Sequence, residues 1–185
     1  MLNPLLLSLE TEAATRGGKL TDGLRARLRE LFAAHADLVW RLLRRQGLSA
    51  DQADDGLQQV FMVALERLQE IRAGSERSFL CSTAILVSRG LSRRKEDLPG
   101  EIPEQLAHGD PETDFELKRK RALLQRVLDQ LDEDLRWALV LQDIEGLSKR
   151  ECAEVLEVPE GTVASRLRRA REQFRELLAK EARTR

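Results

Sequence analysis

The sequence predicts an all-α protein made of two small helical domains joined by an acidic linker. Apolar residues recur at spacings of three and four along most of the 185 residues, and no stretch alternates apolar and polar residues as a half-buried strand does. Apolar residues make up 42% of the chain, charged residues 34% and aromatic residues only 4%, which is typical of helical domains rich in Leu, Ala, Arg and Glu. From about residue 21 on, the longest interruption of the helical pattern lies between residues 96 and 116.

Residues 1–20 are predicted to be an N-terminal extension that is flexible or loosely docked. Their leucine cluster is short and no basic segment precedes it, so it fits neither a membrane span nor a signal peptide. No other segment has the length of a membrane span, and we therefore expect a cytoplasmic protein without membrane insertion. Cys81 and Cys152 are expected to be reduced and buried, with a redox switch between them as the alternative.

The first predicted domain, residues 21–95, contains three helices. The first helix begins near Thr21 and ends at Gly47. Ser49 and Gln52 have the capping-box spacing at the start of the second helix, which residues 73–76 end. The third helix ends in a basic segment before Pro99, and it carries six apolar residues and a threonine, namely Phe79, Leu80, Thr83, Ala84, Leu86, Val87 and Leu91.

The linker, residues 96–116, has eight acidic residues, three prolines and no Lys or Arg. Such a segment is too polar and too rich in proline to form one regular helix. We interpret it as a solvated tether. The alternative is an acidic segment that lies in a basic groove of a partner.

The second predicted domain, residues 117–185, contains four helices. The first begins near Leu117, and Asp132 is placed to cap the second, which runs to Gly146. Ser148 and Glu151 have the capping-box spacing at the start of a short third helix. The turn "PEG" then leads into a long last helix from about residue 162 to 180.

The last helix is apolar on one side and rich in arginine on the other. Between residues 161 and 180 it has six Lys or Arg against two Glu, in a chain whose net charge is only −1. A short helix, a tight turn and a basic second helix form the helix-turn-helix arrangement, whose second helix fits the DNA major groove. The alternative is a solvated face in which Glu172 and Glu176 pair with neighbouring basic residues. The apolar stripe consists of Val163, Leu167, Ala170, Phe174 and Leu177.

No part of the sequence has the residues of a catalytic centre. There is no nucleophile with a neighbouring base, no phosphate-binding loop and no clustered metal ligands, since His35 and His108 are isolated. We therefore predict no enzyme activity, no cofactor and no metal.

The stretch "LSKRECAEVLEVPEGTVASRLRRAREQFRELL" resembles the C-terminal helix-turn-helix domain of bacterial RNA polymerase sigma factors of the extracytoplasmic-function (ECF) group. The stretches "ADDGLQQVFMVALERL" and "SFLCSTAILVSRGLSRRKED" are similar to the other conserved domain of that family. The resemblance covers roughly residues 25 to 180. It implies a factor that positions core RNA polymerase at promoters and is held inactive by an anti-sigma factor.

The resemblance implies a role for particular residues. Asp55, Gln58 and Gln59 would grip a coiled coil of the polymerase β′ subunit, and Arg89, Arg93, Arg94 and Lys95 would contact the downstream promoter element. The upstream promoter element would be contacted by Thr162, Ser165, Arg166, Arg168, Arg169 and Arg171.

The sequence departs from the family pattern at three places. Within the third helix the stretch "LCSTAILVSRG", residues 80–90, has neither the aromatic residues nor the Asn usual in the family, which bears on promoter opening because aromatic faces stabilise unstacked bases. Glu157 stands where the family often has Gly, and a positive φ there would strain it. Ala164 stands where the family often has Lys. Two alternatives to a sigma factor are a dimeric helix-turn-helix regulator that acts without polymerase, and a helical adaptor that binds only proteins.

Overall fold

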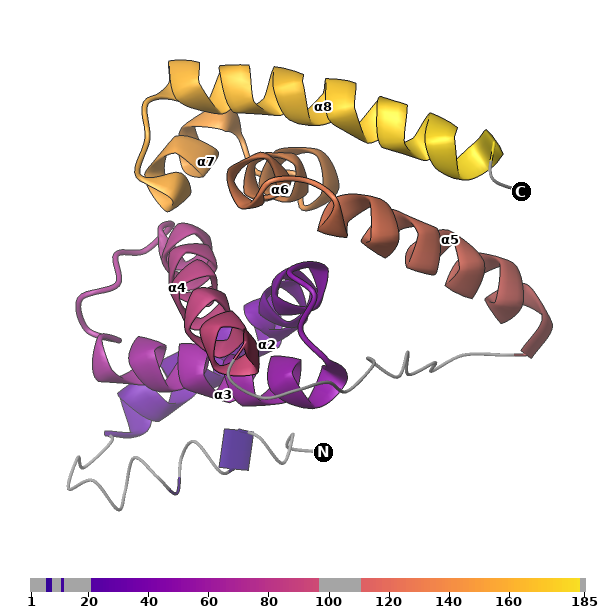
Figure 1. Ribbon diagram of the computed structural model, residues 1–185. Helices are drawn as coiled ribbons and strands as arrows, with labels where there is room; N and C mark the ends of the chain where they lie inside the picture. Colours follow the sequence, from indigo (N-terminus) through magenta and orange to yellow (C-terminus); the bar gives the residue numbers. More distant parts are fainter. Residues whose placement is uncertain (1–5, 8–10, 12–20, 97–110, 184–185) are drawn as a thin grey trace. The chain divides into compact units, whose positions relative to one another are not determined.

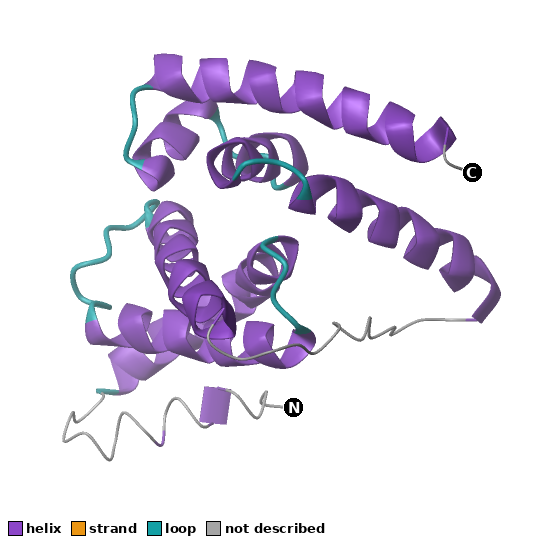
Figure 2. Ribbon diagram, in the orientation of Figure 1, coloured by secondary structure: helices purple, strands orange, loops and turns teal. Residues whose placement is uncertain are grey.

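The computed structural model describes Leu6, Leu7, Thr11, residues 21–96 and residues 111–183 (Figures 1 and 2). Within these ranges the chain forms helices and turns and no strand, which confirms the predicted all-α class. The first of two compact units contains α2 (Asp22–Arg45), α3 (Ala50–Glu66) and α4 (Glu76–Glu96). The second unit contains α5 (Pro111–Asp129), α6 (Glu133–Leu139), the π-helical turn η1 (Val140–Ile144), α7 (Lys149–Leu156) and α8 (Glu160–Arg183).

The C-terminal end of the segment predicted as a linker is helical. Residues 97–110 lie outside the described residues, but α5 already begins at Pro111 instead of near Leu117. Proline is favoured in the first turn of a helix, because the amide hydrogen that it lacks would have no helical partner there. The last six residues assigned to the linker, 111–116, are therefore helical.

The first unit packs α2, α3 and α4 around an aromatic and aliphatic core. The rings of Phe32 and Phe61 lie 4.8 Å apart between their centroids. Gly56 lets α3 approach its neighbours closely, because a Cβ atom there would lie only 3.0 Å from a methyl carbon of Leu43. Leu6, from the N-terminal extension, joins this core with 6% of its surface exposed. At least this residue of the extension is therefore docked on the first unit.

Both predicted capping boxes are confirmed. Ser49 Oγ accepts from the Gln52 amide at 3.2 Å, and Gln52 Oε1 accepts from the Ser49 amide at 2.9 Å. At the start of α7, Ser148 Oγ accepts from the Glu151 amide at 3.2 Å, and Glu151 Oε2 accepts from the Ser148 amide at 2.7 Å. Each box satisfies two amide groups that would otherwise have no partner at a helix start.

The second unit is built around Trp137 of α6, whose side chain is fully buried. Its indole N–H donates to Glu133 Oε1 at 3.3 Å, one helical turn earlier. Helix α8 packs against α6 and α7 over this core. Cys152 of α7 is buried in this unit and Cys81 of α4 is buried in the first unit, as predicted.

The helix after Asp132 differs from the prediction in two ways. Asp132 stands at the N-cap of α6, but its side chain makes no capping hydrogen bond. The α-helix also ends at Leu139 and continues as η1, in which the Glu145 amide donates to the Val140 carbonyl at 2.9 Å. A π-helical turn places one extra residue in the helix. Side chains after Val140 therefore point in directions that α-helical periodicity does not predict.

Candidate nucleic-acid and protein interfaces

The turn between α7 and α8 begins at a residue with an unusual backbone. Glu157 has φ 53° and ψ 43°, in the left-handed region that favours glycine. The backbone therefore has at this position the positive φ that strains a residue with a side chain such as Glu. The Val158 amide donates to the Ala153 carbonyl at 3.1 Å, and the amides of Thr162 and Val163 donate to the Pro159 carbonyl. The second helix thus starts directly after the first, as a helix-turn-helix requires.

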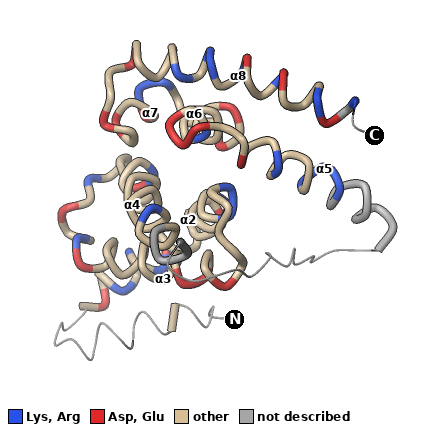
Figure 3. Tube along the Cα trace, viewed as in Figure 1, with Lys and Arg blue, Asp and Glu red and all other residues tan. Residues whose placement is uncertain are grey.

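The predicted apolar stripe of α8 is the side that faces its own domain. Val163, Leu167 and Ala170 are buried, and Phe174 and Leu177 are half-buried. Outside this stripe α8 carries both basic and acidic residues, as the blue and red segments of Figure 3 show, and Leu178 is exposed as well. Because the stripe is held inside the domain, the opposite side is left for a partner.

Two of the predicted DNA-contacting arginines are paired with acidic residues of their own domain. Arg166 Nη2 bonds the carboxylate of Asp134 in α6. Arg171 bonds Asp143 in η1 through two parallel hydrogen bonds, from Nε at 2.8 Å and from Nη2 at 2.7 Å. The hydrogen bonds to Asp143 raise the pKa of Arg171 above its ordinary value, so this side chain stays charged. These two arginines lie at opposite edges of the apolar stripe, since residues of an α-helix follow each other at 3.6 per turn.

The outer face of α8 carries Ser165, Arg168 and Arg169, all exposed. Ser165 Oγ donates to the Thr162 carbonyl at 2.9 Å, and Thr162 itself is half-buried. Arg168 bonds Glu172 at 3.0 Å within the helix, the pairing that the alternative interpretation predicted for this face. No ion pair joins Arg169 to another residue in the described part of the chain. The outward-facing cationic surface of α8 is therefore smaller than the count of its arginines implies.

The predicted contacts to the downstream promoter element lie along the second half of α4. Arg89 is exposed. Arg93, Arg94 and Lys95 follow in the last turns of the same helix, and their side chains lie outside the described part of the structure.

A polar-rimmed groove lies beside α3 at the predicted polymerase-binding residues. It has a volume of about 470 Å³. Asp55 and Gln59 are exposed along it, and Gln58 is half-buried. Met62, Val63 and Val87 supply its apolar surface. The structure therefore brings the three predicted residues together on one groove.

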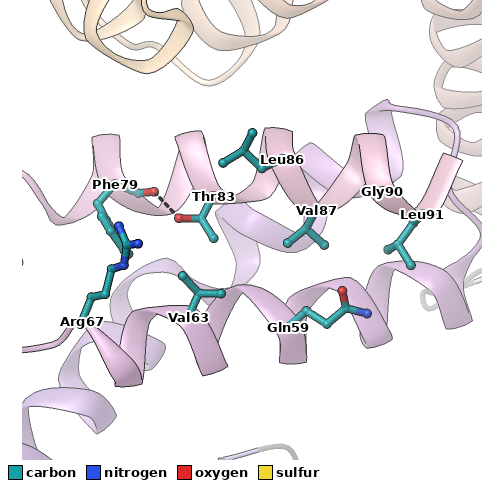
Figure 4. Close-up of a pocket in the computed structure, with 9 residues that line it drawn as sticks. All are labelled: Gln59, Val63, Arg67, Phe79, Thr83, Leu86, Val87, Gly90 and Leu91. Carbon is teal, nitrogen blue, oxygen red and sulfur yellow. Dashed lines mark hydrogen bonds between the residues drawn. The ribbon is translucent and has the colours of Figure 1, made fainter. Parts of the chain in front are cut away.

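A second groove of about 360 Å³ lies between α3 and α4 and shares Gln59, Val63 and Val87 with the first (Figure 4). Its other apolar residues include Phe79 and Leu86 of α4. Leu86 is 68% exposed. Leu86 is one of the apolar positions named for the predicted third helix, and its side chain lies at the surface. Residues 84–87 are four apolar residues in succession, and one helix face cannot bury four consecutive positions.

Three groups of residues that shape these surfaces had no predicted role in them. Met62 and Val63 supply the apolar surface of the first groove, and Leu86 lines the second. The run of four apolar residues around Leu86 was the available signal. Asp134 and Asp143 had no local signal, because they lie 32 and 28 residues from the arginines that they bind.

The described residues contain no group of three or more His, Cys, Asp or Glu side chains that could hold a metal ion. Among the helices described, none combines the length and the apolar character needed to cross a membrane.

The second unit matches a known family directly. The family "Sigma-70, region 4" matches residues 121–174, which run from α5 into α8. The ECF RNA polymerase sigma factor SigE of Mycolicibacterium smegmatis is 35% identical over 159 residues, covering 83% of this chain and 62% of that protein. The ECF RNA polymerase sigma-E factor of Escherichia coli is 31% identical over 156 residues, covering 77% of this chain and 81% of that protein.

The match with the Escherichia coli protein extends over most of both chains, so this chain belongs to the ECF RNA polymerase sigma factors. It spans less than two thirds of the length of the Mycolicibacterium smegmatis relative. CnrH, solved with the cytosolic domain of CnrY, has a similar fold with a TM-score of 0.66 at 24% identity, over 83% of this chain and 88% of that one. The sigma factor RpoE of Bartonella quintana, solved with the anti-sigma factor NepR, has a TM-score of 0.63 at 22% identity, over 82% and 96%.

Proposed function

We propose that this chain directs core RNA polymerase to specific promoters and starts transcription there. The observation that carries the proposal is the exposed outer face of α8, presented by a tight turn within the domain that matches sigma-70 region 4. Membership of the ECF sigma factors supports the same function. The role requires no bond-making chemistry by the chain itself, and it places the protein in the cytoplasm.

The proposed DNA contact follows from the geometry of α8. A helix of this kind enters the major groove with its N-terminal residues toward base edges and its flanking cations toward phosphates. Thr162 and Ser165 stand in its first turns, while Arg168 and Arg169 point outward. Arginine suits guanine and phosphate oxygens equally, because its planar group donates two parallel hydrogen bonds.

The proposed polymerase contact lies on the first unit. The groove beside α3 has an apolar surface with carboxylate and amide groups at its rim, which fits a helical protein partner better than a small ligand. We assign it to the coiled coil of the β′ subunit, with Asp55, Gln58 and Gln59 as the polar contacts. An anti-sigma factor is the second proposed protein partner.

One observation favours a regulator that binds DNA without opening it. Between residues 80 and 90, α4 carries neither an aromatic residue nor Asn, so stacking on unpaired bases has no aromatic support there. Arg89, Arg93, Arg94 and Lys95 would then only position the duplex. Such a regulator would bind its site equally well with and without core polymerase.

Binding to core polymerase tests the groove. We expect the double variant Asp55→Ala, Gln59→Ala to bind core polymerase at least about tenfold more weakly in a co-elution titration, since it removes two polar contacts from the groove rim. The matched control is Asp37→Ala, Gln69→Ala, which changes the same residue types at exposed positions outside the groove. Equal binding by the groove variant and the wild type would remove the assigned surface.

Duplex binding at several salt concentrations tests α8. Each phosphate contact contributes about −0.9 to the slope of log K against log salt. Arg168→Ala, Arg169→Ala should therefore weaken binding and reduce the magnitude of this slope by up to about 1.8. Lys120→Ala, Arg121→Ala on α5 removes the same charge and should leave the slope unchanged. A protein-binding adaptor would show no salt-dependent duplex binding at all.

A further inference from the structure

The six basic residues between positions 161 and 180 do not all face outward. Arg166 and Arg171 reach back to α6 and η1, while Arg168 and Arg169 point away from the domain. The two inward arginines lie at the two edges of the buried stripe, so an acidic residue borders α8 on each side.

The pairing of Arg171 is geometrically specific. Its Nε and Nη2 atoms bond the two oxygens of Asp143, so the planar group lies side by side with the carboxylate. This two-bond arrangement is the one in which arginine holds a carboxylate or a phosphate most firmly. Asp143 therefore occupies the Nε–Nη2 edge of the guanidinium, through which a phosphate could otherwise be bound by two hydrogen bonds, and its charge neutralises the arginine.

The position of Asp143 depends on the π-helical turn. Asp143 lies inside η1, where the backbone departs from α-helical geometry. π-helical turns of this length are rare and are often found at functional sites. The side chains of this pair are 45% exposed for Arg171 and 30% for Asp143, so the pair lies at the surface and DNA could reach it.

We propose that Asp143 and Asp134 are specificity-determining residues, because they neutralise Arg171 and Arg166 and keep these arginines from binding phosphates on any sequence. Phosphate contacts raise affinity for all DNA alike, whereas base contacts discriminate among sequences. If all the arginines of α8 were available, the helix would bind both promoter and non-promoter DNA more tightly. The protein would then discriminate less between the two. The two carboxylates leave the outer face, with Ser165, Arg168 and Arg169, as the surface that reads DNA. This inference rests on the proposed function.

The test is the salt dependence of binding to a duplex of random sequence, with the full-length chain. Asp143→Asn should steepen the slope of log K against log salt by about 0.9, because one arginine becomes available to a phosphate. At 0.1 M salt this corresponds to about five- to tenfold tighter binding to non-promoter DNA. Affinity for a promoter fragment relative to the random duplex should fall.

Two further variants separate this effect from a general change of charge. Asp132→Asn removes one negative charge from an exposed residue that makes no ion pair among the described residues, and its slope should equal that of the wild type. Asp143→Asn, Arg171→Ala removes the released arginine as well and should return the slope to the wild-type value. Asp134→Asn should act like Asp143→Asn through Arg166.

Three results would overturn the inference. In the first, Asp143→Asn and Asp134→Asn leave the slope of log K against log salt at the wild-type value, while Arg169→Ala still reduces the magnitude of that slope. In the second, Asp132→Asn steepens the slope as much as Asp143→Asn does. The third is loss of the folded state in both single variants, judged by circular dichroism, since the carboxylates would then serve folding alone. A wild-type chain that binds no duplex would instead contradict the proposed function.

Discussion

Glu157 is the residue at which the helix-turn-helix carries backbone strain. An L-residue in the left-handed region costs roughly 1–2 kcal/mol relative to glycine. Glu157→Gly should therefore stabilise the second unit by about 1 kcal/mol, after the greater freedom of glycine in the unfolded chain is counted. Urea unfolding, followed by the fluorescence of Trp137 in a Trp40→Phe background, measures this change. Glu157→Ala keeps the Cβ atom and removes the carboxylate, and we expect its free energy of unfolding to equal that of the wild type. If the glycine variant were no more stable than the alanine variant, the claim that the backbone at Glu157 is strained would be wrong.

His35 gives the first unit a pH-dependent stability. Burial lowers the pKa of His35 below its ordinary value of 6.5; Glu76 opposes this and Arg77 adds to it. As the pH falls below 6.5, the unfolded chain binds a proton that the folded state resists, so stability decreases until the folded-state pKa is passed. Above 6.5 this residue has no such effect. Denaturant unfolding between pH 7.5 and 5, monitored by Trp40, should show a steeper loss in the wild type than in His35→Gln. Parallel curves for the two proteins would rule out this role of His35.

At the scale of the element, local chemistry determined what could be predicted. The starts of α3 and α7 were predictable because Ser and a Gln or Glu three residues later satisfy the first amides of a helix within four residues. The turn η1 was not predictable, since no glycine or proline marks Val140 and the apolar residues before it follow ordinary α-helical spacing. Pro111 could have been recognised as the first residue of α5.

The surface of α8 illustrates the same limit. Its apolar stripe follows from helical spacing alone, and so does the outward position of Arg168 and Arg169. The pairing of Arg166 and Arg171 required the tertiary structure, because Asp134 and Asp143 come from another part of the chain. The sequence therefore predicted the face that α8 presents, but not how many of its arginines remain available to DNA.

At the scale of the whole molecule, the two proposed functions, polymerase binding and DNA binding, lie on surfaces of two different compact units. The groove beside α3 belongs to the first unit and the outer face of α8 to the second. Each surface is built within its own unit, so each should function when the other is altered. Substitutions in the groove should leave duplex binding intact, and substitutions on α8 should leave polymerase binding intact.

Run-off transcription with core polymerase and a library of genomic fragments tests the central claim most directly. We expect transcripts from a small set of start sites that core polymerase alone does not use. These transcripts should be lost both in Asp55→Ala, Gln59→Ala and in Arg168→Ala, Arg169→Ala, and kept in the two control pairs. A protein that binds its DNA sites but yields no transcripts above those of core polymerase alone would contradict the assignment as an initiating factor.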